Sequence, residues 1–237
     1  MRFVIALVLS FALVWLCAKP LKKYPVPFYL GAVVLVGLYF WGSATGVRGE
    51  AWSVFQPLMQ RCALAFLLFS IVMFVGVLGE CNPLRVHLMP IRRQLSILAC
   101  IFACGHIAFY ASSYVPRLAS AFTGNLAFSL GLAALITALM VVLWATSAQR
   151  VKHAMKAASW KRVQRLAYPF YVLTYVHLAL LLMPSAAASN DVAVLSIAVY
   201  SVVMGAYVVL RVAKALADRR AMATATTPDL DLEAAAA

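Results

Sequence analysis

Long apolar stretches make up most of this chain, and they limit its possible folds more than any other feature. A helix that crosses a membrane needs about 20 apolar residues to span a hydrocarbon core of about 30 Å. Seven stretches approach this length, and short segments that carry charge separate them. These stretches cover residues 3–18, 26–44, 62–79, 94–112, 125–147, 166–184 and 192–212. The sequence therefore predicts an all-α integral membrane protein with about seven transmembrane helices, or six as the alternative.

The composition supports the same class of protein. Of the 237 residues, 65% are hydrophobic and only 11% are charged. A soluble domain of this length could not cover so much apolar surface. We therefore expect one transmembrane helical domain over residues 1–220, followed by a disordered cytoplasmic tail over 221–237, where the sequence is small, polar and acidic.

The basic residues lie mainly on one side of the predicted helices. The net charge is +13, and 16 of the 20 Lys and Arg residues fall in alternate loops. The four on the other side are Arg2, Arg48, Arg61 and Arg117. This bias predicts an N-terminus outside and a C-terminus in the cytoplasm. It also assigns the positive charge to topology and lipid headgroups, which argues against nucleic acid as a partner.

Residues 1–18 leave one alternative open. One basic residue followed by an apolar core is also typical of a secretory signal. No convincing cleavage site follows, and cleavage would leave Lys19, Lys22 and Lys23 outside the membrane. We therefore favour an uncleaved helix.

Two histidines, His106 and His177, lie deep inside apolar stretches, where an ionisable side chain is expensive. His106 follows Arg93 by 13 residues, and His177 follows Arg165 by 12. At about 1.5 Å per residue, both imidazoles lie roughly 18–20 Å from the basic boundary of their helices. Two imidazoles at one depth on parallel helices can ligate a heme iron from both sides. Gly105 would leave room for the flat macrocycle.

Two other interpretations of the histidines stay open. Each imidazole could serve only to hydrogen-bond a neighbouring helix. The histidines could also form a proton relay, but this hypothesis is weaker than heme binding, because no Asp or Glu lies within a predicted helix. A small transporter would require broken helices, and Pro169 lies too near a helix start to provide a break.

Two segments carry a resemblance to a known family. They are "NPLRVHLMPIRRQLSILACIFACGHIAFY" and "WKRVQRLAYPFYVLTYVH", with "WATSAQR" between them. Residues 62–184 resemble ferric reductase-like transmembrane domains. They are closest to the heme-binding membrane subunit of the bacterial periplasmic methionine-sulfoxide reductase system. The resemblance implies a multi-pass protein of the bacterial cytoplasmic membrane that binds heme b.

The resemblance also implies particular ligands. His106 and His177 match two heme histidines of the family, whereas Gln164 stands where the family has a third. One heme is therefore expected. A second, inner heme would need His87 or His153 as the substitute ligand.

The function implied by the resemblance is that of a b-type cytochrome. Electrons would enter from a cytoplasmic flavin or NAD(P)H reductase, or from quinol, and leave to an extracytoplasmic oxidoreductase subunit. Arg165 and Trp160 at the inner side are candidates for contacting heme, or a transiently bound flavin or quinone. No GxGxxG motif occurs in these residues, so the chain would be an electron-transfer subunit of a larger enzyme. The alternative from another class is a structural or assembly membrane protein without a cofactor.

Overall fold

The computed structural model describes the backbone of residues 2–114 and 124–235, and side chains within residues 8–114 and 124–221. Throughout these ranges the regular elements are helices. In chain order they are α1 (Arg2–Leu16), α2 (Ala18–Lys23), α3 (Pro25–Thr45), α4 (Glu50–Gln60), α5 (Ala63–Val75), α6 (Pro83–Leu88), η1 (Met89–Ile91), α7 (Arg92–Tyr114), α8 (Gly124–Ser147), α9 (Gln149–Ala154), α10 (Ala157–Gln164), α11 (Ala167–Ala187) and α12 (Asp191–Ala235).

The predicted class of protein is confirmed, but the predicted number of membrane-crossing helices is not. Five helices in the described residues are long and apolar enough to cross a membrane, and the pair α4 and α5 is a sixth candidate. Two of the predicted helices account for the difference. The 15 residues of α1 extend for about 22 Å, which is shorter than a hydrocarbon core of about 30 Å. The third predicted helix, α5, has 13 residues and is a candidate span only together with α4. The structure therefore supports five or six spans.

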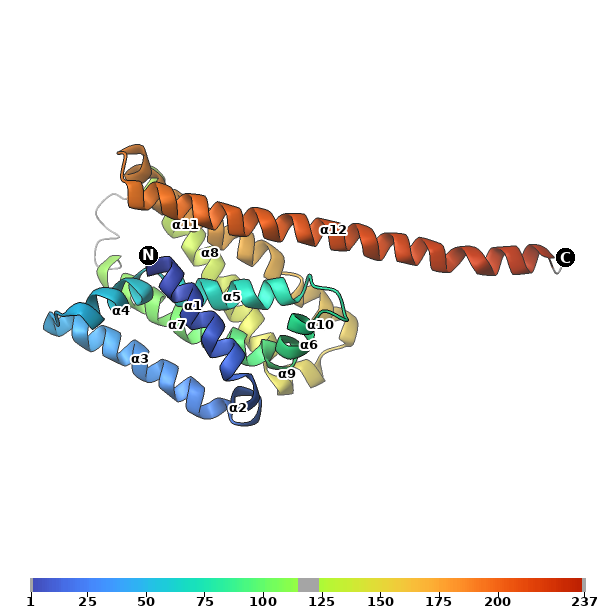
Figure 1. The fold of residues 1–237 in the computed structure, drawn as a ribbon, viewed down its shortest axis with the longest axis horizontal. Coiled ribbons are helices and arrows are strands. Elements are labelled where there is room, and N and C mark those ends of the chain that lie inside the picture. The colour runs from blue at the N-terminus through green and yellow to red at the C-terminus, as the bar shows by residue number, and fades with distance from the viewer. Residues whose placement is uncertain (1, 115–123, 236–237) are drawn as a thin grey trace.

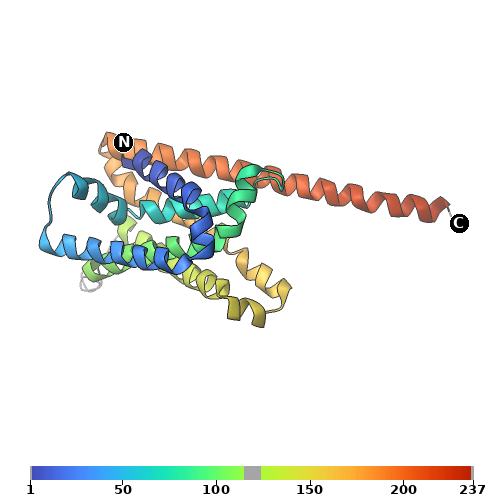
Figure 2. The same ribbon diagram turned by 60° about the horizontal axis from the view of Figure 1, so that its bottom comes forward.

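The helices pack side by side, with α5 and α7 between α3 on one side and α12 on the other (Figures 1 and 2). The short helices α2, α6, α9 and α10 gather at one end of this bundle, and α4 lies at the other end (Figure 1). These four helices carry many of the Lys and Arg residues, so we refer to their end as the basic end. The assignment of this end to the cytoplasm stays a prediction. Arg117, one of the four basic residues predicted on the opposite side, lies outside the described residues.

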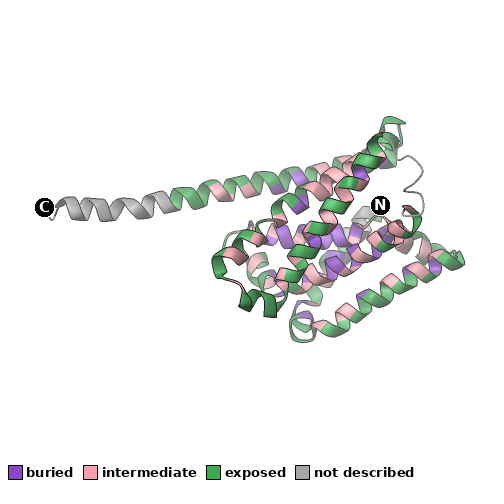
Figure 3. Ribbon diagram, turned by 180° about the vertical axis from the view of Figure 1, so that it is seen from behind, coloured by how far each residue is buried: buried purple, intermediate pink, exposed green. Residues whose placement is uncertain are grey.

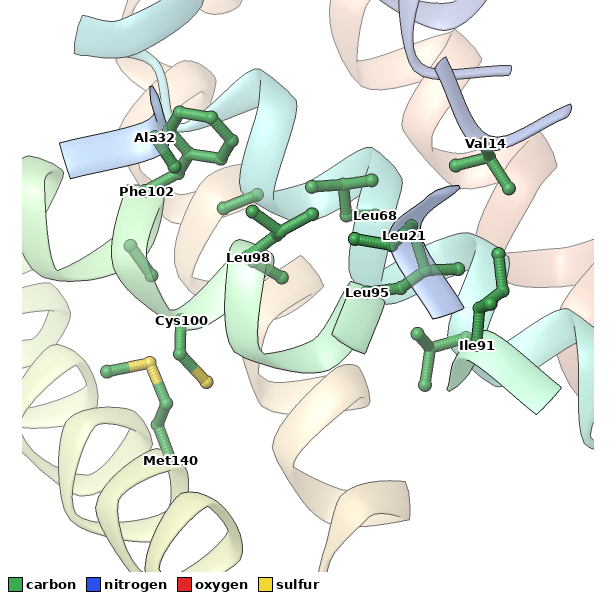
Figure 4. Packing of buried hydrophobic residues seen from close by; sticks show 14 of the residues in the cluster. Val14, Leu21, Ala32, Leu68, Ile91, Leu95, Leu98, Cys100, Phe102 and Met140 are labelled. Atoms are coloured by element: carbon green, nitrogen blue, oxygen red, sulfur yellow. The ribbon is translucent and has the colours of Figure 1, made fainter. Parts of the chain in front are cut away.

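Two clusters of buried side chains meet at α5. The larger cluster joins α5 to α3 and α7, and includes Leu68, Leu95 and Phe102 (Figure 4). The smaller cluster joins α5 to α11 and α12 through Phe66 and Tyr171. The outer faces of α3 and α12 are largely exposed, as expected for surfaces that contact lipid (Figure 3).

A buried hydrogen bond also joins α5 to α11. The hydroxyls of Ser70 and Tyr171 lie 2.7 Å apart, and Tyr171 is 0% exposed. We expect Tyr171→Phe to lower the free energy of unfolding in detergent by about 1 kcal/mol, because it removes this bond and keeps the ring. Tyr175→Phe is the matched comparison, since Tyr175 makes an equally short but less buried bond to Ser201. A larger loss in Tyr175→Phe would contradict the prediction.

The chain bends sharply between α4 and α5, at the start of the predicted third membrane helix. α4 and α5 meet at an angle of 56°, and Cys62 between them has a φ of 55°. This left-handed conformation is uncommon for a residue with a side chain, and it ends the run of helical hydrogen bonds. In an unbroken helix the Gln60 carbonyl would accept a bond from the amide four residues on. The break leaves this carbonyl available to another partner.

At the other end of the chain, α12 continues beyond the bundle to Ala235. Its part from Asp191 to Ala221 is a candidate membrane span. Side chains beyond residue 221 lie outside the described residues, so the division into a domain of 1–220 and a disordered tail stays a prediction.

Candidate functional site

His106 is held by the break between α4 and α5. It lies on α7, and its Nδ1 is 2.8 Å from the carbonyl oxygen of Gln60. A carbonyl only accepts hydrogen bonds, so Nδ1 carries the proton and donates it. The ring of Tyr110, one turn further along α7, lies 4.8 Å from the His106 ring. The position and tautomer of this imidazole therefore depend on the unpaired carbonyl of α4.

His177 is held in the same way by α8. It lies on α11, and its Nδ1 is 3.0 Å from the Ser129 carbonyl oxygen and 3.1 Å from the Ser129 hydroxyl. Ser129 is fully buried, at 0% exposure. A protonated Nδ1 satisfies the carbonyl, whereas the opposite tautomer would turn a nitrogen lone pair towards it. His177 therefore also carries its proton on Nδ1.

The two histidines form a pair with matching chemistry. Their helices, α7 and α11, both start at the basic end of the bundle (Figure 1). With Nδ1 protonated in each ring, Nε2 keeps a free lone pair. Within the described residues, no hydrogen bond uses either Nε2. A backbone carbonyl bound to the remote nitrogen is the usual arrangement behind a metal-ligating histidine, because it orients the ring and raises its basicity.

This donor set fits a heme. In the described part of the chain, no three or more His, Cys, Asp or Glu side chains come together as a site for a bare metal ion. A heme iron needs fewer protein ligands, because the porphyrin supplies four nitrogens and the protein only the axial pair. His106 and His177 would hold it through Nε2.

Gly105 does not have the role that the sequence suggested. A methyl group at this position would lie 2.8 Å from a methyl carbon of Val36 on α3. The missing side chain therefore lets α3 approach α7, and it does not open space for a macrocycle. The reason is helical geometry: neighbouring residues are about 100° apart, so Gly105 and His106 face different partners.

Three polar residues of α11 near His177 form hydrogen bonds away from the two histidines. Tyr171 bonds α5 through Ser70, and Tyr175 bonds Ser201 on α12. Thr174 donates to the Phe170 carbonyl of its own helix. These contacts fix α11 against α5 and α12, and the face that carries His177 is turned to α8.

Trp160 and Gln164, both near the basic end, bind the end of α8. The indole of Trp160 donates to the Thr146 carbonyl at 3.0 Å, and the Gln164 amide donates to the Thr146 hydroxyl at 3.0 Å. These bonds satisfy polar groups where α8 ends. Arg165 is exposed. A role for Trp160 or Arg165 in binding a cofactor stays a prediction.

The two candidate substitute histidines lie near the same end. The His87 ring is 4.5 Å from the Trp15 ring of α1, and its Nε2 lies 3.4 Å from the Trp15 carbonyl. His153 is exposed on α9. Neither the contacts of His87 nor the exposed position of His153 supports a second heme.

Sequence reasoning missed the partners of both histidines. Ser129 is a hydroxyl in the apolar stretch "NLAFSLGLAALI", so its polarity was a usable signal. The Gln60 acceptor is a backbone atom, and every residue has one. Only the polar, proline-containing segment "FQPLMQR" before the third stretch indicated that the helix breaks there.

A helical membrane bundle that holds two imidazoles with free Nε2 atoms has the features of a membrane electron-transfer component. The comparison with protein families agrees. Residues 61–175 match the family described as ferric reductase like transmembrane component. The resemblance to ferric reductase-like transmembrane domains is therefore confirmed over this range, which includes His106 but ends before His177. The narrower likeness to the methionine-sulfoxide reductase subunit stays a prediction.

A curated protein is also similar over most of the chain. It is an uncharacterized protein of Treponema pallidum (strain Nichols), 35% identical over 227 residues. The alignment covers 93% of this chain and 62% of that protein, so the chain spans less than two thirds of its relative's length. No solved structure gives a significant match.

Proposed function

We propose that this protein is a membrane b-type cytochrome that holds one heme between His106 and His177. The observation that carries this proposal is the pair of Nδ1–H bonds to the backbone carbonyls of Gln60 and Ser129. Both rings are thereby oriented, and both keep the nitrogen that binds iron. The ferric reductase-like region supports electron transfer as the general activity.

The residues of the chain would divide the work as follows. A bound heme supplies reversible one-electron chemistry. His106 and His177 would hold the heme iron through Nε2, and the Gln60 and Ser129 carbonyls would keep their rings oriented. Apolar side chains of α5, α7, α8 and α11 exclude water, which keeps the redox centre from side reactions and tunes its potential.

A cavity and a row of aromatic rings lie at the end of the bundle opposite the basic end, where electrons would leave. A cavity of about 480 Å³ lies between α3 and α4, and Phe109 of α7 lines it. The Phe109 and Tyr110 rings are 5.6 Å apart, and Tyr110 is 4.8 Å from His106. A chain of touching rings thus joins the proposed ligand to this cavity. We propose that an extracytoplasmic oxidoreductase subunit accepts electrons at this end.

The basic end would face the electron donor. Arg165 and Lys161 are exposed there, where they could attract a negatively charged flavin or a reductase. The donor would be a cytoplasmic flavin or NAD(P)H reductase, or quinol, and Trp160 would lie near its site. The protein would lie in a bacterial cytoplasmic membrane, and the Treponema relative fits a bacterial origin.

The spectrum of the purified protein tests this proposal. We expect sharp reduced α and Soret bands, and one heme b per chain in a pyridine hemochrome assay. Two hemes per chain would contradict the single site, and would point to His87 or His153 as a further ligand. No heme after expression with ample heme supply would favour the structural, assembly or transport alternatives, in which the histidines only join helices.

A further inference from the structure

A second polar site lies near the basic end of the bundle, between α5, α7, α11 and α12. It is a cavity of about 70 Å³ lined by Arg92, Tyr168, Tyr207 and Arg211, with Gly76 among the residues on the α5 side. Two guanidinium groups thus face one small enclosed space. The Arg92 Nη2 atom lies beside Gly76, 3.8 Å from where a methyl group on that residue would be. None of these residues contacts the proposed heme ligands in the interactions described above.

No carboxylate among the described side chains forms an ion pair with the two arginines of this cavity. Among the described residues, the ion pairs are Arg85 with Glu80 and Lys214 with Asp218, and neither includes Arg92 or Arg211. Arg85 is also bonded to the Leu78 carbonyl at 2.7 Å. Arg211 lies over the Tyr168 ring at 4.6 Å, which leaves the edge of its guanidinium free to donate. A half-buried guanidinium without a carboxylate calls for an anion from outside the chain.

Tyr207 provides an independent indication of a ligand. Its side chain is 3% exposed, and its hydroxyl is buried without a hydrogen-bond partner in the described part of the chain. Its ring is held in place, 5.1 Å from the Tyr171 ring and 5.7 Å from the Phe74 ring. An orphaned buried hydroxyl beside two arginines adds a third group that can donate a hydrogen bond to an anion.

We propose that this cavity binds a phosphate group through Arg92, Arg211 and Tyr207. A water molecule occupies about 30 Å³ in the liquid, so the cavity has room for a small anionic group and not for a flavin or quinone ring. Guanidinium groups bind phosphate with two parallel hydrogen bonds, and Tyr207 would add another donor. The phosphate would come either from a lipid headgroup, which is abundant at a membrane interface, or from solution.

Thermal unfolding of the full-length protein in detergent, after lipid removal, tests this proposal. One series adds inorganic phosphate at constant ionic strength, and another adds phosphatidylglycerol to the micelles, with bound lipid counted by mass spectrometry. We expect at least one source to raise the unfolding temperature. A response to both sources would mean that the site is open to solution, and a response to the lipid alone would identify a headgroup.

Three variants make the test specific. Arg92→Gln and Tyr207→Phe should weaken binding by about tenfold or more, because each removes a donor to a charged group. Tyr207→Phe keeps the ring and its packing, so it should fold even if Arg92→Gln does not. Arg93→Gln removes the same charge from the exposed neighbouring position and should bind normally.

Two outcomes would overturn the proposal: neither source stabilises the wild-type protein, or all three variants respond as the wild type does. In those cases the cavity holds only water. Because heme content is expected to stay unchanged in these variants, failure here is distinguishable from failure of the cytochrome proposal.

Discussion

Replacement of His177 by alanine is expected to abolish heme binding. The variant removes one of the two imidazoles that would hold the iron, and the Ser129 atoms beside His177 are a hydroxyl and a carbonyl oxygen, which do not replace an imidazole. His106→Ala is expected to give the same result, because a heme iron bound by one histidine in a site built for two is easily lost. Reduced-minus-oxidised spectra and a pyridine hemochrome assay on purified protein measure the loss.

The control for these variants is His153→Ala, because His153 is exposed on α9. It should retain the full spectrum and the same heme content per chain. Imidazole added to His177→Ala during purification should restore part of the heme, because a free ligand can enter the space left by the side chain. If both single variants keep a bound heme of unchanged spectrum, the ligand assignment is wrong. Circular dichroism and gel filtration separate loss of ligand from loss of fold.

Gly105→Ala is expected to destabilise the protein by about 1–3 kcal/mol, the usual cost of overpacking a tight contact. The added methyl group would lie 2.8 and 2.9 Å from the two γ-carbons of Val36. Valine has few side-chain conformations to escape into, so α3 and α7 must separate slightly. Denaturant or thermal unfolding in detergent measures the change. Heme content should fall less than in the histidine variants, because the new methyl group faces α3.

Gly131→Ala is the matched control for this effect. Gly131 lies inside α8, and a methyl group there would meet nothing within 4 Å. This variant should be neutral or gain up to about 1 kcal/mol, since alanine favours helix over glycine. Equal stability of the Gly105 and Gly131 variants would show that the contact with Val36 is loose. The double variant Gly105→Ala with Val36→Ala should recover much of the loss, because it removes both γ-carbons.

The apolar stretches predicted most of the membrane helices because hydrophobic length is a local property that each segment carries by itself. The prediction was less good where length and polarity conflict. α1 is apolar but has only 15 residues, and α4 is helical although it contains Glu50 and two glutamines. The segment "FQPLMQR" signals a break, but it does not predict the left-handed conformation of Cys62 or the 56° angle between α4 and α5.

The candidate site, like the fold, could be predicted from the sequence only in part. His106 and His177 could be selected from the sequence, because an ionisable residue in an apolar stretch is rare and conspicuous. Their acceptors could not be selected. A backbone carbonyl can accept a hydrogen bond from a side chain only where the fold leaves it without a helical partner or lets it accept two bonds. Gly105 illustrates the opposite error. Its position next to His106 in the chain suggested a shared role, but successive helical residues point to different neighbours.

The bend between α4 and α5 has a consequence for how this protein tolerates changes in length. One residue inserted into α4 between Pro57 and Gln60 would turn the end of that helix by about 100° relative to its start. The carbonyl that accepts the hydrogen bond from His106 Nδ1 would then face another direction. An insertion in residues 46–49, before α4 begins, leaves the internal phase of the helix unchanged. The connection between α3 and α4 can therefore vary in length, whereas the last turn of α4 must keep its register with His106.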